Sequence, residues 1–145
     1  DFCNQLNGAF SILVIDYKLN KLSIITDKLG IYPIYTYGID NLNSFQFSSN
    51  FKTLLDNINN KVNIDIISIA EFLKKGFIYH PNTFYTEIKT LDNGSYCILD
   101  FNEKKIIKKK YFKVSAKPIY NFNYLVNYNY KLFYCKVFIT VDYVL

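Results

Sequence analysis

Short apolar runs separated by polar and turn-forming residues dominate the first third of the chain. Residues 8–17 and 22–27 form two such runs, and the polar, Asn-containing link between them predicts a β-hairpin. Hydrophobicity along both runs is continuous rather than alternating, which is typical of central strands that are covered on both faces. A second pair of strands is expected over 31–38 and 44–49.

The period of the pattern then changes from that of a strand to that of a helix. Residues 50–58 carry apolar side chains at helical spacing, with Ser49 or Asn50 in position to cap the N-terminus. A more regular helix is predicted between Asp65, which can cap it, and Gly76, which stops it. Four side chains form the expected apolar face of this second helix: Ile66, Ile69, Ala70 and Leu73.

The remaining chain divides into a patterned part and an unpatterned tail. Residues 80–83 are expected to form a loop, and 95–101 and 105–114 are expected to be strands around a polar turn. Residues 118–145 show no clean period, and we interpret them as a shifted reading frame or as the start of a further domain. We therefore expect one domain over 1–117, followed by an unassigned tail.

The stretch TDKLGIYPIY, residues 26–35, interrupts the sheet pattern with three poor strand formers. Asp27 follows an apolar run, where its carboxylate can accept hydrogen bonds from the amides of its own loop. Gly30 stands where a reversing chain can need a positive φ. Pro33 removes a backbone donor, so it fits an edge, a bulge or the beginning of a strand. The stretch predicts a tight, rigid loop.

Composition indicates a globular domain of ordinary size, because half of the 145 residues are hydrophobic and 20% are charged. The net charge of +5 comes from lysines spread along the chain without any Arg, and we interpret this excess as solvated surface. No run reaches the ~18 apolar residues of a membrane span, and no signal pattern opens the chain. We expect a cytoplasmic protein. Since the chain contains no Met, we interpret it as a fragment of a longer reading frame.

Candidate catalytic side chains are few. Cys3, Cys97 and Cys135 lie far apart, without the spacing of a metal site or a disulfide framework, which suits a reducing compartment. Cys3 is not the first residue, whose α-amino group would serve a nucleophile as base, so Cys3 is expected to be a small buried residue, and Cys97 to lie in the core. His80, followed by Pro81, is expected to be a solvated turn residue, because a lone His lacks the orienting partner that base catalysis needs.

Lysines concentrate in 104–113, together with two aromatic residues. Positive charge beside stacking platforms is typical of a nucleic-acid site. Lysines also protect edge strands against aggregation, and we favour an edge strand because no Arg and no second basic cluster accompany the segment. Two alternatives to an enzyme stay open: a non-enzymatic basic and aromatic binding module that uses this segment, and a non-functional relic of a disrupted gene.

Four short motifs follow one another along the chain. Their characteristic residues are, in order, Leu6, Gly8 and Phe10; Asp27, Gly30, Pro33 and Tyr35; Phe47, Ser49, Lys52 and Leu54; and Ala70, Glu71, Leu73, Gly76, Pro81, Thr83, Ile88, Leu91 and Gly94. In this order and spacing, over about 5–113, they resemble the glutaminase half of the asparagine synthetase family.

The resemblance implies an α+β fold class, as an incomplete four-layer αββα sandwich of the N-terminal nucleophile hydrolase type. It implies a parent protein that hydrolyses glutamine with an N-terminal Cys and passes the ammonia through a tunnel. The acceptor would be aspartate, activated by ATP and Mg in a synthetase domain in cis. No nucleic-acid or membrane partner is implied, and a homodimeric parent is allowed. Relatives that close β-lactam rings or lasso peptides are the alternative within the family.

Residue by residue, the resemblance carries over structural positions rather than catalytic ones. The nucleophile and the glutamine-binding motifs would precede this chain and the ATP-binding motif would follow residue 118, so the chain itself is expected to be inactive, with no cofactor and no metal site. Ala9 and Tyr32 match the mouth of the ammonia tunnel, where an apolar wall suits Ala9 and Tyr32 adds a hydroxyl. A structural role is implied for the residues of the family's signature turn: Asp27, Gly30, Pro33 and Tyr35.

Two positions depart from the family pattern. Thr26 stands where the family usually has an Arg, and Asn50 stands where it usually has a Glu. Either change can weaken a charged contact that orders the loop or the face between domains. A divergent or degraded parent is one interpretation of these departures.

Overall fold

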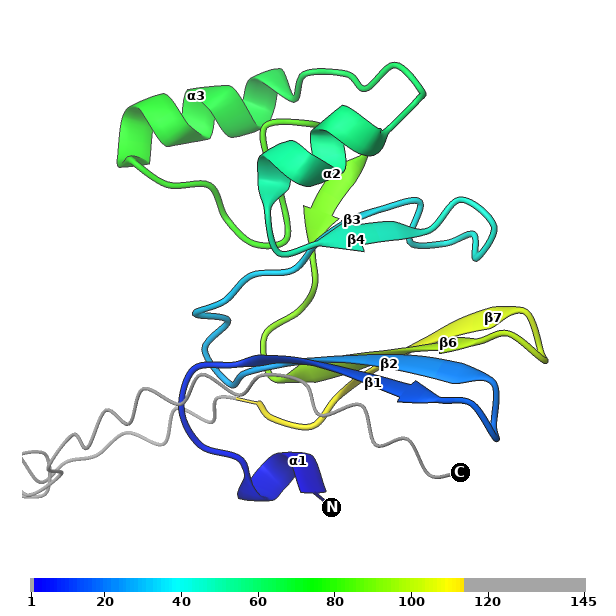
Figure 1. Cartoon of the computed structure of the whole chain (residues 1–145). Coiled ribbons are helices and arrows are strands. Elements are labelled where there is room, and N and C mark those ends of the chain that lie inside the picture. The colour runs from blue at the N-terminus through cyan, green and yellow to red at the C-terminus, as the bar shows by residue number, and fades with distance from the viewer. Residues whose placement is uncertain (1, 114–145) are drawn as a thin grey trace, which may run out of the picture.

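Two antiparallel sheets stack on each other in the computed structural model, which describes residues 2–113 (Figure 1). The first sheet has the strand order β1-β2-β6-β7, with β1 (Ser11–Asp16), β2 (Lys21–Thr26), β6 (Ser95–Asp100) and β7 (Lys105–Lys110). The second sheet has the order β4-β3-β5, with β3 (Tyr35–Tyr37), β4 (Gln46–Ser48) and β5 (Ile88–Thr90).

Helices cover the outer sides of these sheets. Helix α2 (Phe51–Asn57) and helix α3 (Ile66–Lys75) lie beyond the second sheet, and the short helix α1 (Phe2–Gln5) lies beyond the first sheet (Figure 1). Helices and antiparallel sheets in one chain confirm the α+β class. None of the helices within residues 2–113 is long and apolar enough to cross a membrane.

The predicted first hairpin is confirmed, with Ser11 paired to Thr26 and Asp16 paired to Lys21. Its turn is closed by Asp16, whose Oδ1 accepts a hydrogen bond from the backbone N–H of Leu19 at 2.8 Å. The expectation that both strands are central is wrong for β1. Among the described residues, this strand lies at the edge of its sheet, and its Val14 and Ile15 are 44% and 47% exposed, whereas β2 lies between β1 and β6.

The hairpin of β6 and β7 is also confirmed, and β7 is an edge strand of the sheet, as the lysines of 104–113 predict. Asp100 fixes its turn, because its Oδ1 accepts from the amides of Asn102 and Glu103 at 3.1 Å each. The same carboxylate pairs with Lys21, 3.0 Å away on β2, at the position where the two strands are in register.

Helix α2 forms where the sequence predicts it, on the strand pair β3 and β4. Asn50 rather than Ser49 is its N-cap, because the Asn50 side chain accepts from the amide of Thr53 at 3.0 Å. Asn50 therefore has a local structural role as the cap of this helix. Tyr35 packs edge-on against Phe51, with the ring centroids 5.2 Å apart.

Helix α3 has the predicted ends but not the predicted apolar face. Asp65 caps it by accepting from two backbone amides, and Gly76 ends it with a φ of 80°. Ile66 and Leu73, however, are 77% and 80% exposed, and Ala70 is exposed as well. The reason is that contact with the rest of the described chain runs through the other side of the helix, where Phe72 packs edge-on against Phe84.

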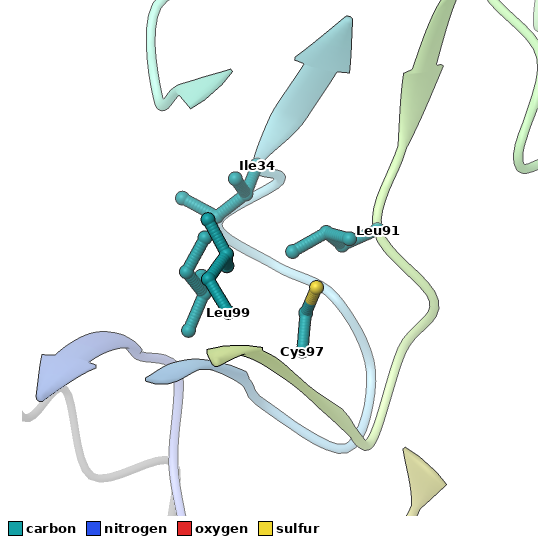
Figure 2. Close-up of a cluster of buried hydrophobic side chains, with 5 residues drawn as sticks. Ile34, Leu91, Cys97 and Leu99 are labelled. Atoms are coloured by element: carbon teal, nitrogen blue, oxygen red, sulfur yellow. The ribbon is translucent and has the colours of Figure 1, made fainter. Parts of the chain in front are cut away.

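The core lies between the two sheets. Ile24, Cys97 and Leu99 of the first sheet meet Ile34 and Leu91, which flank strands of the second sheet (Figure 2). The backbone N–H of Leu91 donates to the carbonyl of Ile34 at 2.8 Å, which ties these two flanking segments together. Cys97 is a core residue as predicted, and its burial raises the pKa of the thiol.

Some elements escape prediction. The pattern does not predict the strand β5 or the helix α1. Cys3, which is expected to be buried, is only half-buried, and none of the side chains of the four-residue α1 is buried. The predicted loop over 80–83 is confirmed. The expectations for residues 118–145 and for Cys135 fall outside the described residues.

Candidate functional site at the Asp27 loop

The carboxylate of Asp27 organises the loop between β2 and β3. The residue is 1% exposed. Its Oδ1 accepts from the amides of Leu29 at 2.8 Å and Ile31 at 3.2 Å. Its Oδ2 accepts from the amides of Ile31 at 3.0 Å, Phe10 at 3.3 Å and Tyr32 at 3.4 Å. One side chain therefore replaces the partners that four backbone amides would find in a regular strand.

The backbone of Asp27 extends this network to a third segment. Its N–H donates to the carbonyl of Phe10 at 3.1 Å, and its carbonyl accepts from the amides of Gly30 at 3.2 Å and Gly94 at 2.8 Å. The segment before β1, the Asp27 loop and the turn before β6 thus meet at a single residue. Because these segments are distant in sequence, the contact fixes tertiary structure as well as a local turn.

Gly30 is required by the loop on two counts. Its φ is +67°, a conformation that residues with a side chain rarely adopt. A Cβ at this position would lie 2.1 Å from Oδ1 of Asn93. The Asn93 side chain is itself engaged, since its amide donates to the carbonyl of Leu29 at 3.0 Å. The loop and the turn before β6 therefore pack with no room for a methyl group.

Thr26 orders the same region without a charge. It is 1% exposed, and its hydroxyl donates to the carbonyl of Asp92 at 2.6 Å and accepts from the amide of Ser95 at 3.2 Å. The hydroxyl of Tyr111 donates to the Thr26 carbonyl at 2.6 Å. Burial is the first cause that raises the pKa of Tyr111 to about 12, which keeps this donor protonated at neutral pH.

Pro33 and Tyr35, the other two residues of the signature turn, are not among the hydrogen-bond partners of the Asp27 carboxylate. Pro33 lies two positions before β3 and so outside any strand, because the strand expected over 31–38 spans only Tyr35–Tyr37. Tyr35 is the first residue of β3, beneath α2. The structure thus brings Asp27 and Gly30 together, whereas Pro33 and Tyr35 start the crossing to the second sheet.

Ala9 and Tyr32 belong to the two segments that the Asp27 carboxylate joins. Ala9 is buried, and the residue after it donates its amide to Asp27. Tyr32 is 40% exposed, and its carbonyl accepts from the hydroxyl of Ser11 at 2.6 Å. The loop therefore holds the segment of Ala9 against the segment of Tyr32.

A second polar cluster surrounds His80, which sequence reasoning leaves without a partner. Its Nε2 lies 2.8 Å from Oδ1 of Asp92, and its Nδ1 lies 2.7 Å from the hydroxyl of Thr90. A neutral ring that donates to Asp92 can accept from Thr90, and a protonated ring can donate to both. His80 is an exposed turn residue, as expected. The expectation that its ring lacks a partner is wrong, because β5 and the residues after it return to the loop of His80.

Asp92 completes this cluster by binding Lys110 of β7 as well, at 3.1 Å. Partial burial alone would raise the pKa of the Asp92 carboxyl, but hydrogen bonds from His80 and Lys110 outweigh it and hold the pKa below its ordinary value. The carboxylate is therefore ionised at neutral pH. It links the loop of His80 to β7 at the end where the chain crosses from β5 to β6.

The hydrogen bonds of the Asp27 loop indicate a structural role. The carboxylate oxygens already face four backbone donors, so the arrangement favours a structural role over that of a general base. Within residues 2–113, no three His, Cys, Asp or Glu side chains gather as metal ligands would.

Comparison with known proteins places this geometry in context. A family model described as "Glutamine amidotransferase domain" matches residues 1–112. "Putative asparagine synthetase (glutamine-hydrolyzing) 2" of Methanocaldococcus jannaschii is 31% identical over 140 residues, covering 94% of this chain and 27% of the relative. "Asparagine synthetase (glutamine-hydrolyzing) 1" of Bacillus subtilis is 27% identical over 116 residues, covering 80% of this chain and 18% of the relative. The chain thus spans at most 27% of the length of these two relatives.

Replacing the carboxylate of Asp27 should destabilise the fold. In Asp27→Asn, one acceptor oxygen becomes an NH₂ group that faces backbone donors, and we expect a loss of about 2 kcal/mol or more in the free energy of unfolding. Asp16→Asn is the matched control, because its single acceptor bond to Leu19 can persist, and we expect a change within about 0.5 kcal/mol. Urea unfolding of the chain measures both; equal losses would contradict the account.

Gly30 and Gly76 offer a matched pair for the packing of the loop. Both have positive φ, but a Cβ at Gly76 would meet nothing within 4 Å. Gly76→Ala should therefore cost only the conformational term of about 1–2 kcal/mol. Gly30→Ala should cost at least about 1 kcal/mol more, because the Asn93 side chain must give up its bond to Leu29. Thermal or urea unfolding that shows equal costs would rule out the tight packing.

Proposed function

Because this chain belongs to the glutamine amidotransferase domain family and is homologous to asparagine synthetases, we propose that it forms part of the glutaminase domain of an asparagine synthetase-like protein. The family match over residues 1–112 is the observation that carries the proposal. The whole protein would hydrolyse glutamine and transfer the ammonia to an ATP-activated aspartate, with Mg assisting the nucleotide chemistry. The names of the two relatives support glutamine hydrolysis and asparagine synthesis.

Within that protein, the described residues would supply much of a four-layer αββα sandwich of the N-terminal nucleophile hydrolase type. The stacking of two antiparallel sheets, with α2 and α3 outside one of them and α1 outside the other, supports this assignment (Figure 1). The Asp27 loop would then act as the brace that holds the inner layers in register.

The tail would begin the domain that follows the glutaminase domain. The boundary of the proposed domains lies between residues 117 and 118. The match to the Methanocaldococcus jannaschii relative covers 94% of the chain, so it extends beyond residue 118. This supports a continuing homologous domain rather than a shifted reading frame. ATP, Mg and aspartate would bind in that following domain rather than in residues 1–117.

The chain as given would not hydrolyse glutamine. Cys3 is half-buried on α1, and the family resemblance assigns the nucleophile to none of the described residues. We expect glutamate release by the chain to equal that of a sample without protein, and Cys3→Ala to leave it unchanged. Release above that background that disappears in Cys3→Ala would contradict the proposal.

Ala9 and Tyr32 would line the mouth of the ammonia tunnel in the whole protein. The closeness of their segments at the Asp27 carboxylate and the burial of Ala9 support this position. An apolar wall at Ala9 offers ammonia no hydrogen-bonding groups that would retain it.

A larger side chain at Ala9 should therefore block ammonia transfer. In the whole protein, we expect Ala9→Leu to lower glutamine-dependent asparagine formation several-fold, while glutamine hydrolysis and formation from added ammonia persist. Ala70→Leu, at an exposed position of α3, is the matched control and should change none of the three rates. Equal retention of the glutamine-dependent rate in both variants would remove Ala9 from the tunnel.

A further inference from the structure

A cleft of about 600 Å³ opens between β7 at the edge of the first sheet and the segments around β5. Sites for small molecules usually have volumes of roughly 300–1,000 Å³, so this cleft can hold one. None of the residues of the Asp27 loop, 27–34, lines it. From its charge and shape, we propose that the cleft binds a small organic phosphate.

The lining of the cleft is strongly basic. Among the described residues, five lysines line the cleft and Asp92 is its one carboxylate; the lysines are Lys89, Lys108, Lys109, Lys110 and Lys113. On β7, Lys108 pairs in register with Cys97 and Lys110 pairs with Ser95, both of which are buried between the sheets. Paired residues lie on the same face of a sheet, so Lys108 and Lys110 occupy the face that lines the cleft.

The positive charge of these lysines is incompletely compensated. Lys110 shares the Asp92 carboxylate with His80. Lys108 lies 3.5 Å from Asp40, whose side chain is 93% exposed, and such exposed pairs are weak. Lys89 donates to the neutral side-chain oxygen of Asn82 at 3.1 Å. A phosphate dianion would give these ammonium groups a common counter-charge.

The remaining lining suits the body of an organic ligand. Ile39, Pro81 and Leu91 supply apolar surface. The hydroxyls of Thr90 and Ser95 beside it are held by His80 and by the carbonyl of Asp92. Ligand sites commonly combine an apolar wall with a few polar groups that fix orientation. Lysine binds phosphate as a compact point charge, and a dianion can meet two ammonium groups at once. An ester of phosphate with an apolar body therefore matches both parts of the cleft.

Phenyl phosphate is a suitable probe, because it combines a phosphate with an apolar ring. Titration of the full 145-residue chain, followed by calorimetry or amide chemical shifts, should show saturable binding. Lys89→Gln combined with Lys110→Gln should weaken it about tenfold, since two charge-assisted contacts are lost. Lys18→Gln combined with Lys74→Gln removes the same net charge outside the cleft and should leave the affinity unchanged.

Asp92→Asn is expected to raise the affinity for phenyl phosphate, a result that misfolding of the variant would not produce. The amide keeps the size of the side chain and removes the only carboxylate among the described residues that line the cleft, so binding of phenyl phosphate should tighten several-fold. Inorganic phosphate should bind more weakly than phenyl phosphate, and benzyl alcohol should not compete.

Three results would overturn the proposal. No saturable binding is one, and an equal loss in the two double-lysine variants, which would indicate diffuse surface charge, is another. The third is a single-stranded oligonucleotide that binds more tightly than phenyl phosphate and whose affinity is unchanged in the Lys89→Gln, Lys110→Gln variant. The basic groups would then bind a polymer outside the cleft.

Discussion

A single buried carboxylate holds together the segments from which the two sheets diverge. Asp27 accepts hydrogen bonds from four backbone amides, three in its own loop and one at Phe10 before β1. A carboxylate is well suited to this position, because its two oxygens can serve several donors that converge from different directions. Without it, amides buried beside the core would lack partners, which is costly in a protein interior.

The poor strand formers of this stretch follow from the same constraint. The chain leaves β2 in the first sheet and must enter β3 in the second, so regular pairing has to end between them. Asp27 satisfies the amides that the break would expose, Gly30 allows the reversal, and Pro33 stands where no strand partner is needed. Thr26 and Tyr111 close the other side of the junction with uncharged hydrogen bonds.

Local patterns predict the parts of this fold whose cause is local. The two hairpins of the first sheet follow from apolar runs around polar turns, and Asp65 and Gly76 mark the ends of α3 through their own side-chain and backbone chemistry. The three-residue β5 is too short to display a period, so it escapes prediction. The link between His80 and Asp92 depends on how β5 returns to its neighbouring loop, which residue spacing alone does not determine.

The exposed face of α3 marks another limit of periodicity, because an apolar stripe predicts burial without identifying what covers it. The candidate site is likewise only partly predictable from the sequence. The sequence indicates a rigid loop at Asp27, whereas the convergence of Phe10, the loop and Gly94 is a property of the fold.

Hydrogen exchange tests this convergence most directly. The amides of Phe10, Leu29, Ile31 and Tyr32 should be protected together, far beyond the exposed turn amide of Leu19. Exchange of these four amides as fast as that of Leu19 would contradict the central role of Asp27.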